Sequence, residues 1–194
     1  MGQLENLKHL PPLAPTISLE PASSPSLKDR RKADSCSDEF VNLGFASLGS
    51  FTIPEKPGYV VIAFIDEKEN IFGFIQEFPQ LGIFAELRCY YEDGTRLRVS
   101  NYITTLTPEQ RENKKAPQGE NGSSESSSTI AINREGASVT GLAALMKESL
   151  GDKPRKALSG ELFKACYEND YAEEAKHINE VIEQLNAQLV KRVC

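Results

Sequence analysis

The stretch IFAELRCYYEDGTRLRVSNY, residues 83–102, decides the fold. Apolar and polar side chains alternate on both sides of its central Asp-Gly pair, which is the period-two pattern of a β-hairpin with one buried face. A two-residue Asp-Gly loop would place Cys89 opposite Arg98 and mix the two faces. A three-residue loop with Gly94 at positive φ places Cys89 opposite Leu97 and keeps the faces separate. The pattern therefore predicts the three-residue loop.

In this register the polar face of the hairpin gathers cationic and aromatic side chains. Arg88 lies opposite Arg98, and like charges directly across a ladder are destabilising unless something offsets them. Arginine forks suit carboxylate and phosphate groups, so the face is a candidate site for an anion or an acidic partner. The alternative is a solvated face with internally paired charges, or one covered in part by a helix. The candidate ligand-binding residues are Arg88, Tyr90, Arg96 and Arg98.

Short strand-like segments precede and follow the hairpin. Short polar connections between consecutive strands predict an antiparallel meander of about five strands. Gly73 interrupts one segment and indicates a bulge or a close approach of another group to the backbone. The further predicted strands are Ser50–Pro54, Tyr59–Ile65, Ile71–Phe78 and Thr129–Asn133.

Two helices are predicted after the strands. The first spans Val139–Leu150, and the second begins after Ser159 and continues to about Lys191. From Ile178 onward the apolar spacing is heptad-like, which fits either packing within the chain or a weak homodimer through the C-terminal helix. The fold class expected is α+β, with both C-terminal helices packed on one face of the sheet.

Two polar segments set the expected domain limits. Residues 1–38 are rich in proline, serine and charge, so we expect a disordered tail. Residues 107–128 are of low complexity and are expected to form a disordered insertion. The predicted domain is a single unit over residues 39–192 that this insertion interrupts.

Composition excludes several classes of function. The chain has 194 residues and a net charge of −6, which argues against a broad basic surface for nucleic acid. The longest apolar run, Tyr59–Ile65, is far shorter than the roughly 20 residues that cross a bilayer. The 4 cysteines form no CxxC pair, which favours free thiols in a reducing compartment. We therefore expect a soluble cytoplasmic protein that does not interact with a membrane.

Catalytic and metal-binding motifs are missing from the sequence. Only two histidines are present, and His177 lies eleven residues along a predicted helix from Cys166, which is about 16 Å and too far for a catalytic pair. No phosphate-binding loop, nucleophile elbow or dinucleotide fingerprint occurs. The expectation is no metal and no cofactor, and catalytic residues remain unknown.

Three strings of the sequence resemble a family of uncharacterised bacterial proteins. They are LGFASLGSFTIP at residues 43–54, QEFP at 76–79 and YEDGTRLRVSN at 91–101, and the segment from Leu158 to Ala172 is similar to the start of that family's C-terminal helix. The resemblance covers roughly residues 43–105 and 138–175. It implies one domain interrupted by a loop, and no activity or catalytic residue.

The leading hypothesis is a non-catalytic cytoplasmic binding module for a protein or a small anionic ligand. One alternative is a hydrolase or transferase whose site forms only in three dimensions. Another alternative, from size, acidity and the expected tail, is a secretion-associated chaperone or effector.

Overall fold

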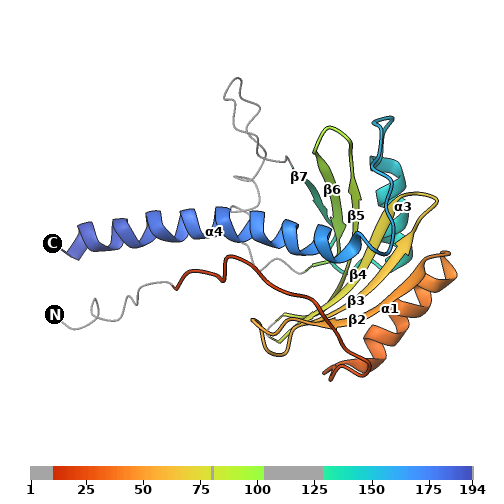
Figure 1. Ribbon diagram of the computed structural model, residues 1–194, viewed down its shortest axis with the longest axis horizontal. Helices are drawn as coiled ribbons and strands as arrows, with labels where there is room; N and C mark the ends of the chain where they lie inside the picture. The colour runs from red at the N-terminus through yellow and green to blue at the C-terminus, as the bar shows by residue number, and fades with distance from the viewer. Residues whose placement is uncertain (1–10, 80, 103–128, 194) are drawn as a thin grey trace.

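The computed structural model describes residues 11–79, 81–102 and 129–193. Over this part of the chain it confirms the α+β class (Figure 1): seven strands form one sheet in the order of the sequence. Neighbouring strands are antiparallel except β6 and β7, which are parallel. The strands are β1 (Glu20–Pro21), β2 (Ala46–Thr52), β3 (Val60–Asp66), β4 (Ile71–Phe78), β5 (Gly82–Tyr90), β6 (Arg96–Ser100) and β7 (Thr129–Asn133). The helices are α1 (Arg30–Asn42), α3 (Val139–Ser149) and α4 (Phe163–Val193).

The predicted hairpin register is confirmed. Cys89 pairs with Leu97, and Arg88 pairs with Arg98. Tyr91 and Thr95 close the turn by a hydrogen bond from the Tyr91 N–H to the Thr95 carbonyl, 2.9 Å. Gly94 adopts a φ of 82°, which an L side chain would find strained. The three-residue loop thus keeps Leu87, Cys89, Leu97 and Val99 on one face.

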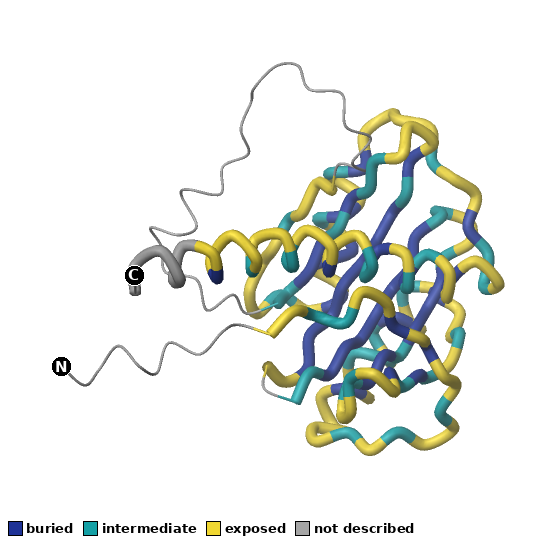
Figure 2. Tube along the Cα trace, turned by 60° about the vertical axis from the view of Figure 1, so that its left-hand side comes forward, coloured by how far each residue is buried: buried dark blue, intermediate teal, exposed yellow. Residues whose placement is uncertain are grey.

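Alternation along the strands gives the sheet two apolar faces. Odd-numbered residues of β5, such as Leu87, face α1 and α3, and we name this side the α1/α3 face. On the other side Phe72 and Phe74 of β4 share a buried cluster with Phe163 and Tyr167 of α4, and we name it the α4 face. Figure 2 shows the buried strands between these two layers.

The prediction that both C-terminal helices pack on one face is wrong. Both pack on the sheet, but α3 lies on the α1/α3 face and α4 on the opposite one. The connection between them passes around the end of the hairpin, where the Lys156 N–H donates to the Tyr90 carbonyl at 2.8 Å and Tyr91 forms a bridge with Arg155. This crossing brings α4 to the far side.

The prediction of a disordered tail up to residue 38 is wrong for residues 11–38. Ile17 and Leu19 are buried in the α4 face, and Ala33 of α1 is buried in the opposite core. Asp29 caps α1 by accepting from the Lys32 N–H. These three apolar residues are spaced so that each reaches a core. The predicted domain limit at residue 39 falls inside α1. The predicted insertion at residues 107–128 lies outside the described residues.

Gly73 allows α1 to approach the sheet. A Cβ at this position would lie 2.4 Å from Cε1 of Phe40, whose ring covers the glycine. The close approach expected from the sequence is therefore present, while β4 stays regularly paired at this point. The irregularity of the sheet lies instead in β2, between Ser47 and Gly49.

Candidate functional site

The candidate residues of the hairpin meet on the α4 face, as predicted, but α4 covers them. β5 supplies Arg88 and Tyr90, and β6 supplies Arg96 and Arg98, paired across the ladder. None of the three arginines is left to an external anion, because each forms an ion pair with a carboxylate of α4.

Arg88 is the most deeply placed of the four, with 8% of its surface exposed. Its Nε donates to Oε1 of Glu86, and its Nη1 donates to Oδ2 of Asp170 at 2.8 Å. The guanidinium lies between two aromatic rings, 4.8 Å from the centroid of Phe74 and 5.1 Å from that of Tyr167. Burial disfavours the charge, but Glu86 and Asp170 favour it, and the pKa of Arg88 stays well above its usual value.

Asp170 is the acceptor that joins the group. Besides Arg88, it accepts from the Tyr90 hydroxyl at 2.5 Å and from Nη1 of Arg96. Burial is the main reason that the pKa of the Tyr90 hydroxyl is raised, so this side chain stays protonated and donates. Asp170 thus receives three donors from two strands, which is what a buried carboxylate requires.

Arg96 and Arg98 form the more exposed part of the group. Arg96 also contacts Glu173 of α4 at 3.0 Å and donates from Nε to Oγ1 of Thr129 at 2.5 Å. Arg98 lies 3.6 Å from Glu174. The charges on the hairpin face are therefore matched by acidic side chains of the same chain, and the group can hold α4 to the sheet.

Sequence reasoning missed Asp170. A signal existed, because Asp170 follows Phe163 by seven residues and Tyr167 by three, and both spacings return to the same side of a helix. A carboxylate on the apolar side of the helix indicates a buried cationic partner. The sequence does not say which arginine that partner is.

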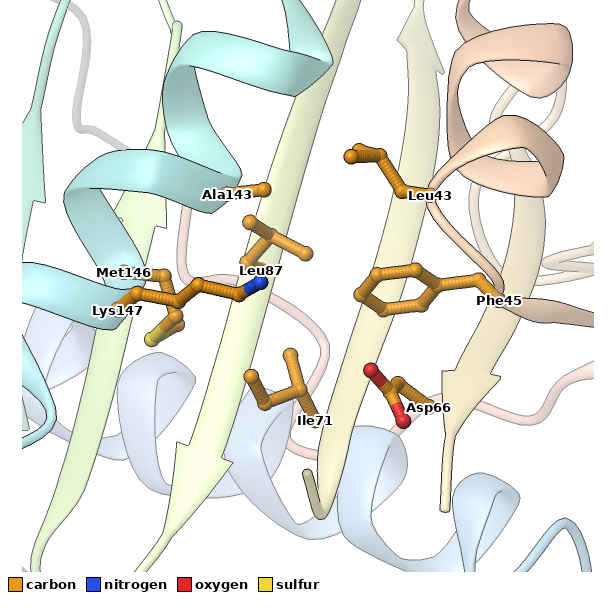
Figure 3. Close-up of a pocket in the computed structure, with 8 residues that line it drawn as sticks. All are labelled: Leu43, Phe45, Asp66, Ile71, Leu87, Ala143, Met146 and Lys147. Atoms are coloured by element: carbon orange, nitrogen blue, oxygen red, sulfur yellow. The ribbon is translucent and has the colours of Figure 1, made fainter. Parts of the chain in front are cut away.

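A second candidate is a small pocket between the end of α1, the sheet and α3 (Figure 3). Its volume of about 20 Å³ holds roughly one water molecule. Asp66 and Lys147 project into it from opposite sides, and the other side chains are apolar. The lining residues are Leu43, Phe45, Asp66, Ile71, Leu87, Ala143, Met146 and Lys147.

The described cysteines are free thiols with little nucleophilic character. Cys89 is fully buried in the α1/α3 face, and this burial raises its pKa to about 11. The pKa of Cys36 and that of Cys166 are raised as well, again chiefly by burial. Within the residues that the structure describes, no group of three or more histidine, cysteine or acidic side chains is placed to hold a metal ion.

In comparisons with known proteins, no family model, no curated protein and no solved structure matches this chain. None of the helices in the described part of the chain has the length and apolarity needed to cross a bilayer.

Proposed function

We propose that this chain is a non-catalytic binding module that contacts its partner helix to helix, through the outer half of α4. The proposal rests on one observation, which is that α4 extends well beyond the sheet on which it packs. α4 has 31 residues, a length of about 46 Å. Its first half packs on the sheet through buried Phe163 and Tyr167. Beyond that point Figure 1 shows it running away from the sheet toward the C-terminus.

The outer half carries an apolar stripe that is partly open to solvent. Ile178, Ile182 and Leu185 follow one another at spacings of four and three residues, as in a coiled coil. Val181 borders this stripe, and both Val181 and Leu185 are 42% exposed. Figure 2 shows the part of this half whose burial is described, up to residue 187, mostly as exposed and intermediate. Apolar side chains at coiled-coil spacing favour a second helix as the partner.

The partner that the stripe fits best is a second copy of the chain. In a two-fold dimer the same stripe meets itself, so charges beside it would repel between copies. The positions that flank the stripe in a heptad are instead uncharged, being Asn179, Val181 and Asn186. Two heptads bury little surface, so a weak and concentration-dependent dimer is the expected assembly.

A small anionic ligand at the hairpin arginines is not part of the proposal. Such a ligand would have to displace Asp170, Glu173 and Glu174, which already lie against these arginines. The enzyme and chaperone alternatives gain no supporting arrangement from the described residues. Free cysteines support a reducing compartment, so we place the module in the cytoplasm.

The test compares two substitutions that add the same charge on different sides of α4. Leu185→Glu places a carboxylate in the stripe, whereas Ala187→Glu places it at an exposed position outside the stripe. Sedimentation over a concentration series should show a monomer–dimer equilibrium for the native chain and for Ala187→Glu, and only monomer for Leu185→Glu. A native chain that stays monomeric throughout, or two variants that dimerise equally, would contradict the proposal.

A further inference from the structure

An extended part of the chain, residues 13–22, lies along α4 beside the edge of β2, and we name it the N-terminal segment (Figure 1). Its side chains alternate between the protein and solvent. Ile17 and Leu19 are 4% and 1% exposed and join the buried cluster of the α4 face, while Ser18 and Glu20 are exposed. The two aliphatic residues, two positions apart, are its anchors.

Side chains of the folded body hold the backbone of this segment. The Asn179 amide accepts from the Leu13 N–H at 2.7 Å and donates to the Leu13 carbonyl at 3.0 Å. Glu168 of α4 accepts from the Leu19 N–H at 2.8 Å, and Glu55 accepts from the Ser18 N–H at 3.1 Å. These bonds reach only main-chain atoms, which every extended peptide presents.

The end of the N-terminal segment adds a short strand to the sheet. Glu20 pairs with Thr52 and Pro21 with Phe51, and the Ala22 N–H donates to the Ser50 carbonyl at 2.8 Å. Strand addition at a sheet edge, buried alternate side chains and main-chain hydrogen bonds are the three components by which proteins bind extended peptides. All three are present here, and the chain itself supplies the peptide.

We propose that the groove between α4 and the edge of β2 is a binding site for an extended peptide of a partner protein, with two aliphatic residues two positions apart. The N-terminal segment occupies it as an internal competitor. Because the segment is tethered, its effective concentration is on the order of millimolar, and a free peptide must compete against it. This site lies beside the stripe of α4, with Asn179 next to both, and peptide binding does not require the proposed dimer.

The experiment separates the segment from the body after folding. A protease recognition sequence is inserted between Ser23 and Ser24 of the full-length chain, at two exposed positions between β1 and α1. The probe is a fluorescein-labelled peptide, PPLAPTISLEPAS, with the sequence of residues 11–23. After cleavage and gel filtration, fluorescence anisotropy should show saturable binding, at least about tenfold tighter than to the uncleaved chain, because the tether no longer holds the competitor.

Two matched controls test whether the probe binds in the groove. A peptide with Ile17→Asp and Leu19→Asp should not bind, since its anchors cannot enter the apolar cluster. Asn179→Ala in the cleavable chain should weaken binding several-fold, because two main-chain bonds are lost. The cleaved chain must still be folded for these results to count. Its circular dichroism spectrum should therefore match that of the native chain.

Other outcomes would overturn the proposal. A cleaved chain that unfolds would make the segment an integral part of the core. Equal binding of both peptides, or equal binding to cleaved and uncleaved protein, would place the probe elsewhere on the surface. A dimer of the uncleaved chain that is lost on Ile17→Asp and Leu19→Asp substitution would assign the groove to the segment of a second copy, which is not the partner proposed.

Discussion

At the scale of single residues, Asp170 neutralises Arg88 and Arg96 on the α4 face, while Glu174 pairs with Arg98. Arg88 and Arg98 lie directly opposite each other, an arrangement that destabilises a sheet unless the charges are neutralised. The hairpin sequence was enough to predict this opposition, because strand alternation is a local property. It could not predict the neutralising carboxylate, which comes from a helix more than eighty positions along the chain.

Replacing Asp170 by asparagine should lower the free energy of unfolding by about 3 kcal/mol. The substitution keeps the size of the side chain but leaves the buried guanidinium of Arg88 with Glu86 as its remaining charged partner. Glu174→Gln is the matched control, because Glu174 and Arg98 are partly exposed and lie 3.6 Å apart, so its loss should cost less than about 1 kcal/mol. Urea denaturation measures both. If both variants lost the same free energy of unfolding, the buried ion pair of Asp170 would contribute no more to stability than the exposed one of Glu174.

At the scale of elements, strands were easier to predict than the N-terminal part of the chain. Ile71–Phe78 is predicted and observed with the same limits, because its apolar run is long and bounded by turns. The N-terminal residues have the composition of a disordered tail, yet Ile17, Leu19 and Ala33 are buried. Amino-acid composition describes the segment as a whole. The burial of this segment depends instead on a few apolar side chains, which pack into cores formed by strands that are distant in the sequence.

Gly73→Ala should loosen the packing of α1 on the sheet. The new methyl group would overlap the Phe40 ring, and overpacking of this kind costs about 1–3 kcal/mol. Gly141→Ala is the control: Gly141 lies within α3, its added methyl group would come no nearer than 3.5 Å to another group, and alanine is the better helix former. Thermal unfolding should therefore show a lower midpoint for the first variant and an equal or higher one for the second. If Gly73→Ala left the thermal midpoint unchanged, α1 would be able to move away from the sheet without a loss of stability, and the prediction would be wrong.

At the scale of the whole molecule, the sheet is shared by two cores. Both C-terminal helices have an apolar side, and periodicity alone does not say which face of the sheet each will cover. That choice depends on the connection after α3, which pairs with the end of the hairpin at Tyr90 and Tyr91 before α4 begins. A tertiary contact of this kind leaves no pattern in the local sequence, so the opposite placement of α3 and α4 could not be predicted.

A shared sheet should make the two cores unfold together. Leu142 of α3 and Phe163 of α4 are both almost fully buried, on opposite faces, and truncating either to alanine should cost about 2–5 kcal/mol. The same strands contribute side chains to both cores. Each variant should therefore shift the whole unfolding transition to a lower urea concentration. Far-ultraviolet circular dichroism and tyrosine fluorescence should give one coincident midpoint, the latter serving as probe because the chain has 6 tyrosines and no tryptophan. If Phe163→Ala instead produces an early separate step, with the remaining transition at the native midpoint, then α4 is an independent cooperative unit laid on a sheet that α1 and α3 stabilise alone.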